Sequence, residues 1–260
     1  MSQARGRSGQ QRVGYVHWTV EAEPTDIDHN LARNRSLAAA TEKLFELFNR
    51  HHQPATWAVG DPAHSAVAGL VTKSTTKHAL ALLGDRYWIG QTAGRTRFAR
   101  ELARRASQAR AAGIETVTLV PRVASVAEHI DLVVKHDIHA VVTTNEAASS
   151  APRSVHYGVW EFGVKARLPQ PMSWLPGSGW KLARSIQRAA REAATVHLLI
   201  DASAVEEAGG SVTRSVERLL KRTAKLQDRG LVHVETLSAA VARLSERPAA
   251  TPQRSILRAA

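Results

Sequence analysis

Residues 36–60 constrain the fold most, because a helix, a polar turn and a buried strand follow one another there. Apolar side chains recur at the helical spacing of three and four residues, at Leu37, Ala40, Leu44, Leu47 and Phe48. Pro54 cannot continue this helix, and the apolar run of residues 55–59 ends at Gly60. The segment therefore predicts a helix followed directly by a strand of a buried sheet.

Helices and apolar strands alternate along the rest of the chain. We predict the other strands at residues 12–21, 77–83, 115–120, 138–143, 157–166, 195–200 and 231–235. Strong helical patterns lie between them, at residues 96–112, 126–136, 181–193, 211–228 and 238–245. Continuous apolar strands that alternate with helices are typical of a parallel sheet covered on both faces. We expect an α/β fold, a single irregular (β/α) barrel of about seven strands over residues 12–245, with disorder in residues 1–11 and a flexible tail at 246–260.

Composition excludes several classes of chemistry. The chain has no cysteine, so disulfides, thiolate catalysis and cysteine-bound metals are excluded. The sequence has no apolar run of 18 residues, so we expect no membrane span. The start, MSQARGRSGQQR, is basic without a following apolar segment, so it is not a secretory signal and we expect a cytoplasmic protein.

A formal net charge of +12 raises the question of a polyanionic partner such as nucleic acid. Two predicted helices carry arginine stripes, at Arg97, Arg100 and Arg104 and at Arg184, Arg188 and Arg191. With three tyrosines and four phenylalanines, platforms for stacking single-stranded bases are scarce. Solvated helix surface is therefore the favoured interpretation, and a polyanion site is the less favoured alternative.

The carboxyl ends of the predicted strands are the expected place for a functional site, because barrels of this kind carry their chemistry there. This rule selects the polar residues Glu21, Asp85, Arg122, Asn145 and Asp201. Tryptophans also lie near predicted strand ends, and indole rings at a barrel mouth stack well on sugar rings. We expect three of them to line one cavity with Asp85 and Asn145: Trp57, Trp88 and Trp160.

Four segments, taken in order, resemble the polysaccharide deacetylase (NodB-homology) family. They are QPATWAVG at 53–60, KHALALLGD at 77–85, FARELARRASQARAAGIETVTLVPR at 98–122, and TVHLLIDA at 195–202 with the helix and strand after it. The resemblance covers most of residues 12–245. It implies an irregular (β/α) barrel that hydrolyses non-peptide C–N bonds in carbohydrate metabolism, using a divalent metal such as zinc held by one aspartate and two histidines.

The residues at the family's site positions depart from that pattern. The resemblance places the first-strand carboxylate at Glu21 and the orienting arginine at Arg122. The two metal-binding histidines correspond to Leu83 and Tyr87, and the proton-donating histidine corresponds to Asp201. Leucine cannot bind a metal, so we expect no metal site and no cofactor unless other residues rebuild the site.

Three functions remain open on the sequence. The first is a degenerate deacetylase-fold protein that binds a carbohydrate or acetamido ligand. The second is an active deacetylase or amidase with a rearranged site, in which Glu21 acts as base or ligand, Asp85 or Asp201 is a second carboxylate, and Arg122 orients them. The third is a basic polyanion-binding protein. No feature of the sequence indicates an oligomeric state.

Overall fold

The computed structural model describes residues 12–23, 31–89, 94–122, 126–144, 151–169 and 178–246, without the side chains of residues 31–34 and 178–179. The predicted disordered N-terminus and flexible C-terminal tail lie outside this range, apart from Glu246, and so does Asn145.

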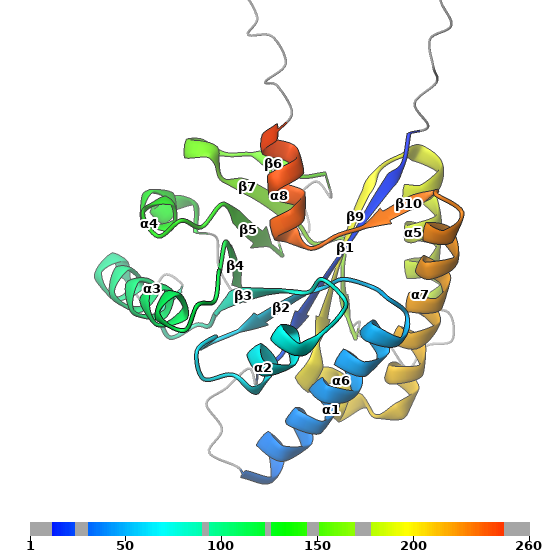
Figure 1. The fold of residues 1–260 in the computed structure, drawn as a ribbon, viewed down its shortest axis with the longest axis horizontal. Coiled ribbons are helices and arrows are strands. Elements are labelled where there is room, and N and C mark those ends of the chain that lie inside the picture. The colour runs from blue at the N-terminus through cyan, green and yellow to red at the C-terminus, as the bar shows by residue number, and fades with distance from the viewer. Residues whose placement is uncertain are drawn as a thin grey trace, which may run out of the picture.

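The described residues form one mostly parallel sheet of ten strands, which curls into a half-barrel (Figure 1). Its strands are β1 (Gly14–Glu21), β2 (Thr56–Val59), β3 (Ala79–Gly84), β4 (Thr118–Pro121), β5 (Ala140–Thr143), β6 (Arg153–Ser154), β7 (Trp160–Gly163), β8 (Ala166–Leu168), β9 (Thr195–Asp201) and β10 (Val232–Val234). The order is β6-β7-β5-β4-β3-β2-β1-β9-β8, and β10 pairs with the start of β1. Only the β6–β7 pair is antiparallel among these strands, so the α/β barrel-like class predicted from the sequence is confirmed.

Helices cover the convex face of the sheet, and one helix covers its concave face (Figure 1). They are α1 (Leu31–Arg50), α2 (Ala66–Lys73), α3 (Gly94–Ala111), α4 (Ile130–Lys135), α5 (Ser178–Glu192), α6 (Ala202–Ala208), α7 (Gly210–Asp228) and α8 (Leu237–Glu246), with 3₁₀ turns η1 (Ala127–His129) and η2 (His156–Gly158). None of the described helices is both long and apolar enough to cross a membrane.

Side chains of β1 alternate between the two faces, as the geometry of a strand requires. Val16 and Trp18 are fully buried in the convex-side core, which α1, α5 and α7 complete. The intervening residues are polar, and His17, Thr19 and Glu21 are each fully buried on the concave side. β1 therefore brings an unusual row of polar groups into the interior of the half-barrel.

The concave face is filled by an apolar cluster beneath this polar row. Leu83 and Val120 pack there against Leu237 and Val241 of α8. The Leu237 N–H donates to Thr56 Oγ1 at 3.0 Å, which fixes the start of α8 beside the start of β2. The carboxyl ends of the strands lie at the other end of this face from the start of α8.

The strand predicted at residues 157–166 is divided between the two edges of the sheet. β7 pairs with β5 at one edge, whereas β8 pairs with β9 at the other. The link between them is short: the Val164 N–H donates to Thr143 O at 2.9 Å, and the Lys165 N–H donates to His197 O at 2.8 Å. If β7 and β8 are counted as one crossing segment and the short edge strands β6 and β10 are left out, seven strands remain, in agreement with the predicted number.

Candidate ligand site at the carboxyl ends of the strands

Two carboxylates lie side by side at the carboxyl ends of the neighbouring strands β1 and β9. Glu21 ends β1, Asp201 ends β9, and the two residues are paired in the register of these parallel strands. Both are buried, with exposed fractions of 0% for Glu21 and 7% for Asp201. Two carboxylates that are buried next to each other require compensating positive charge.

Two arginines supply that charge. Arg122 follows β4, and its Nε donates to Glu21 Oε2 at 3.2 Å. Arg167 projects from β8, and its Nη2 donates to Glu21 Oε2 at 2.7 Å and to Asp201 Oδ2 at 2.8 Å. The Arg167 guanidinium therefore bridges the two carboxylates. We call Glu21, Arg122, Arg167 and Asp201 the carboxylate–arginine cluster.

Asp201 also has a structural role, because its second oxygen caps α6. Asp201 Oδ1 accepts the backbone N–H groups of Ser203 at 3.1 Å and Ala204 at 3.2 Å. This is the usual arrangement of an aspartate at a helix N-cap. The contacts fix the carboxylate in place, so Asp201 is a poor candidate for a mobile proton donor.

Glu21 combines a shifted pKa with a side-chain oxygen that has no partner among the described residues. Burial raises the pKa of Glu21 above its ordinary value, and the positive charges of Arg167 and Arg122 offset part of this effect. Its Oε1 atom is buried and has no hydrogen-bond partner among the described residues. Glu21 therefore keeps one acceptor position that no described residue satisfies.

Glu23 contacts the cluster through its backbone, and its carboxylate binds other groups instead of pairing with Glu21. Its carboxylate accepts the backbone N–H groups of Gly60 and Asp61, and burial raises its pKa. Its backbone carbonyl accepts a hydrogen bond from Arg122. A Cβ atom on Gly60 would lie 2.3 Å from Glu23 Oε2, so this contact requires a glycine.

Arg105 of α3 connects Asp85 and Trp88 to this support. It donates to the carbonyl of Gly60, its Nη2 lies 4.0 Å from Asp85 Oδ2, and its guanidinium lies 5.2 Å from the centre of the Trp88 ring. Trp88 is only 1% exposed, so its ring is covered by the protein itself. The structure thus places Asp85 and Trp88 near the carboxyl ends of the strands, but outside the carboxylate–arginine cluster.

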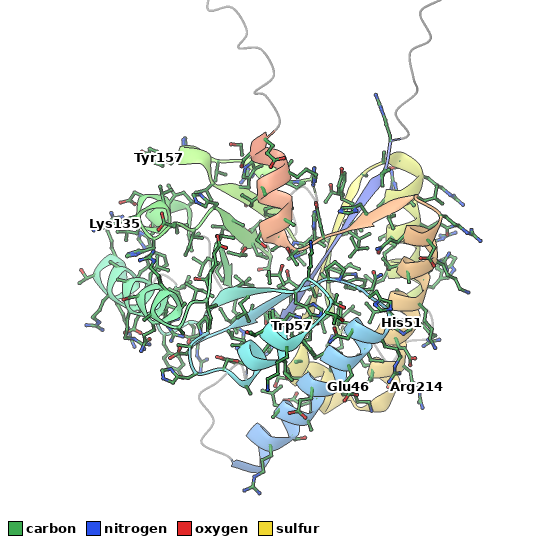
Figure 2. The ribbon with its side chains drawn as sticks, viewed as in Figure 1. Glu46, His51, Trp57, Lys135, Tyr157 and Arg214 are labelled. Atoms are coloured by element: carbon green, nitrogen blue, oxygen red, sulfur yellow. The ribbon has the colours of Figure 1, made fainter. Side chains whose placement is uncertain are left out.

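The other two tryptophans lie away from the carboxyl ends of the strands. Trp57 faces the convex side, fully buried against Phe45 and Phe48 of α1 (Figure 2). To line the barrel mouth as expected, the Trp57 side chain would have to point from β2 to the concave face, whereas it points to the convex face. Trp160 starts β7 and pairs with Ala140 at the start of β5, so it lies towards the amino-terminal ends of the strands.

The described residues at the positions that the resemblance assigns to metal ligands do not fit a metal held by one carboxylate and two histidines. Leu83 is buried in the apolar concave cluster, and Tyr87 is on a turn with 37% of its surface exposed. The Arg167 guanidinium bonds to both carboxylates, so a cation already occupies the position between them. Across the described ranges, no three histidine, aspartate or glutamate side chains converge on one point.

Sequence reasoning missed Arg167 and the buried histidines. Arg167 directly follows the strand predicted at residues 157–166, and only its pairing with β9 reveals its direction. His17 and His197 are paired in register on the concave side, where His197 Nε2 lies 2.9 Å from Thr19 Oγ1. Burial lowers the pKa of His17 to about 4 and that of His197 to about 3, so both are neutral at pH 7.

Comparison with known proteins supports the fold alone. No family model and no curated protein matches the sequence. The structure resembles a candidate polysaccharide deacetylase from Mycobacterium smegmatis, with a TM-score of 0.65 and 12% identity over 94% of this chain and 93% of that chain. It also resembles Puue allantoinase, with a TM-score of 0.59 and 12% identity over 91% of each chain.

A third similar structure is a family 4 acetyl xylan esterase from Clostridium thermocellum, solved in complex with a cobalt ion. Its TM-score is 0.51, with 13% identity over 90% of this chain and 93% of that chain. The chain therefore has a deacetylase-like fold that spans nearly the full length of these proteins. At this level of identity, the site must be judged from its own residues.

Proposed function

We propose that this chain binds a carbohydrate or acetamido ligand at the carboxylate–arginine cluster, and that it does so without metal-dependent hydrolysis. The observation that carries this proposal is the bridge from Arg167 to Glu21 and Asp201, at 2.7 and 2.8 Å. A bridging guanidinium leaves no room for a divalent ion between the same two oxygens.

Arg167 is the group of the cluster that a ligand can reach. Its side chain is 36% exposed, whereas that of Arg122 is 3% exposed. One of its nitrogens holds the two carboxylates, and its other N–H groups remain as donors of fixed direction. Sugar hydroxyls and acetamide carbonyls are acceptors that suit such donors. In this arrangement Glu21 and Asp201 hold Arg167 in place, and Arg122 holds Glu21.

The second candidate is a metal-independent amide hydrolase with a rearranged site. The raised pKa of Glu21 and its unbonded Oε1 favour this alternative, because a general base needs a free acceptor atom. The guanidinium of Arg167 would then stabilise the oxyanion that forms on the acetamide carbonyl. Both candidates use the same cluster, and they differ in whether acetate is released.

A binding titration with N-acetylglucosamine oligomers tests the proposal. We expect saturable binding by calorimetry, weakened about tenfold or more in Arg167→Met, because a charged donor to the ligand is lost. The matched control is Arg95→Met, which removes an exposed arginine paired with Asp131 on a different part of the surface. Absence of binding to the wild-type protein, or equal binding by Arg167→Met, would refute the proposal.

Acetate release from the same oligomers separates the two candidates. Under the first, the purified protein releases no acetate above the buffer rate. Release that persists in the presence of a chelator and disappears in Glu21→Gln would favour the second candidate instead.

A further inference from the structure

We infer that the exposed face of α5 binds single-stranded nucleic acid. This face, which we call the α5 basic face, consists of Trp180, Lys181, Arg184, Arg188 and Arg191. It lies on the convex side of the half-barrel, because the opposite face of α5 packs on β1 and β9. The inference is therefore independent of the carboxylate–arginine cluster and of its ligand.

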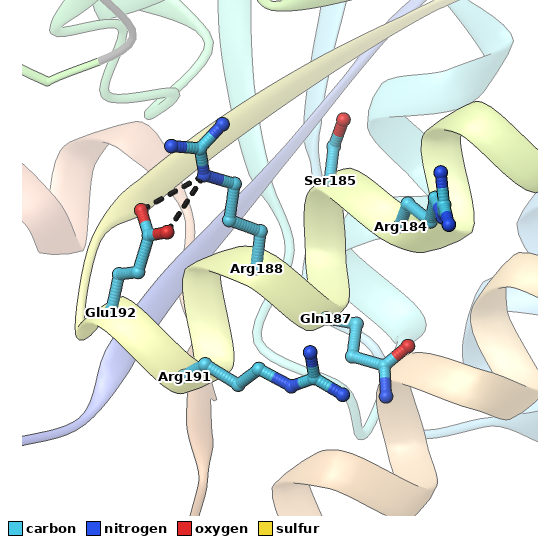
Figure 3. Close-up of a pocket in the computed structure, with 6 residues that line it drawn as sticks. All are labelled: Arg184, Ser185, Gln187, Arg188, Arg191 and Glu192. Carbon is cyan, nitrogen blue, oxygen red and sulfur yellow. Dashed lines mark hydrogen bonds and ion pairs between the residues drawn. The ribbon is translucent and has the colours of Figure 1, made fainter.

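Positive charge dominates the α5 basic face. Its four cationic residues are exposed and follow one another at helical spacings of three and four. Three of them line a shallow surface concavity of about 460 Å³ with Ser185, Gln187 and Glu192 (Figure 3). Glu192 is the one carboxylate among these lining residues, and Arg188 Nε binds it at 2.8 and 3.0 Å. The concavity keeps a net positive charge.

Arg191 is available for a phosphate group. Within the part of the chain that the structure describes, its guanidinium has no hydrogen bond or ion pair. Figure 3 shows its side chain extending towards the Gln187 amide. Gln187 Oε1 accepts a hydrogen bond from Arg222 of α7 at 2.7 Å, so a second helix adds a cation beside Arg191. Planar guanidinium groups bind phosphate oxygens in pairs, which suits a nucleic-acid backbone.

Trp180 distinguishes this face from an ordinary solvated helix. It is 56% exposed, although a tryptophan normally contributes its large apolar surface to the core. The Arg184 guanidinium lies 3.6 Å from the centre of its ring. An exposed indole next to a row of arginines offers a surface on which a nucleic-acid base stacks while its phosphates bind the cations. The scarcity of aromatic residues in the sequence had argued against such a platform.

The arginine stripe of α3 provides an internal comparison. Arg104 donates to Glu101 at 3.2 and 3.0 Å and to Gln108 at 2.9 Å. Arg100 lies 3.7 Å from the same glutamate. Two of the three arginines in this stripe are therefore already paired within their own helix. We expect the α3 stripe to contribute little to binding a polyanion.

Fluorescence anisotropy with a labelled single-stranded RNA of about 15 nucleotides tests the inference at 50 to 200 mM salt. We expect the triple variant R184Q/R188Q/R191Q to lose about tenfold or more in affinity. Its log–log salt slope should be smaller by about 2, because about 0.7 counterion is released for each of three phosphate contacts on a single strand. Trp180→Ala should lose about fivefold or more.

The matched control is R97Q/R100Q/R104Q, which removes the same charge from α3 and should change the affinity less than about threefold. Thermal melting checks that each variant is folded. Equal losses in the two triple variants would show binding by net charge alone and overturn the inference. So would an absence of RNA binding to the wild-type protein at 50 mM salt. A loss in Trp180→Ala that is no larger for RNA than for heparin would assign the face to acidic polysaccharides instead.

Discussion

The buried histidines His17 and His197 should make the folded protein sensitive to mild acid. Burial is the main reason that the pKa of His17 is lowered to about 4 and that of His197 to about 3. In the unfolded chain both imidazoles titrate near 6.5. At pH values between 6.5 and these lower pKa values, the unfolded state binds protons that the folded state does not bind. The contribution of this pair to stability is therefore present above pH 6.5 and is lost as the pH falls.

The size of this effect follows from the pKa values. Lowering a pKa from 6.5 to about 4 corresponds to about 3 kcal/mol for His17, and the corresponding figure for His197 is about 5 kcal/mol. The free energy of unfolding should fall by up to about 3 kcal/mol per pH unit between pH 6 and 4.5. A domain with a total stability of about 5–15 kcal/mol would lose much of it over this range.

Chemical denaturation at a series of pH values, followed by tryptophan fluorescence, measures this slope. The informative variant is His17→Leu/His197→Leu, which should unfold at lower denaturant concentration at pH 7 because Thr19 loses its partner. Its stability should nevertheless fall less steeply below pH 6.5. The control is His139→Gln, at an exposed position.

Other groups titrate near the pair, and the variant comparison removes their effect. Glu235 and Arg243 act on His17 with opposite signs, and His233 lowers its pKa further. The raised pKa values of Glu21 and Glu23 oppose the loss of stability, because the folded state gains protons there first. If the wild-type and double-variant curves run parallel from pH 6.5 to 4.5, the reasoning about buried neutral imidazoles is wrong.

Three substitutions test the packing and charge balance described above, each by denaturant unfolding. Arg122→Met should cost about 3 kcal/mol, because it leaves the buried Glu21 with one guanidinium fewer; a loss below about 1 kcal/mol would contradict the buried ion pair. Trp57→Ala should cost about 3–5 kcal/mol through the cavity it leaves in the convex core, while ligand binding stays intact in the protein that remains folded. Gly60→Ala should cost about 1–3 kcal/mol because the new methyl group overlaps the Glu23 carboxylate, and an unchanged midpoint would show that this carboxylate moves freely.

The periodicity of the sequence predicts the fold because most elements carry a complete local signal. The helix and strand of residues 36–60 appear as α1 and β2, with the turn near Pro54. Glu21, Arg122 and Asp201 were selected because they end or follow parallel strands, and the structure brings these three together. The rule that functional residues lie at the carboxyl ends of parallel strands is therefore sufficient to predict this part of the site.

The remainder of the site depends on pairing between distant strands, which the local sequence does not encode. Arg167 lies on a strand of three residues whose direction is set by β9. Trp57 lies in a short strand that is buried on both faces, so its pattern contains no information about which face the indole occupies. For His17 and His197, the sequence shows two isolated residues, and only the register of β1 and β9 reveals that they are neighbours.

The short crossing between β7 and β8 has a consequence for self-association. A sheet with two open margins normally exposes backbone donors and acceptors that can recruit another chain. In the described part of this molecule, the outermost strands β6 and β8 have two and three residues. Residues 164 and 165 also hold the two margins together through their own backbone hydrogen bonds. Among the described residues, neither margin offers a template long enough for a second copy to extend, so we expect the curled sheet to resist fibrous aggregation.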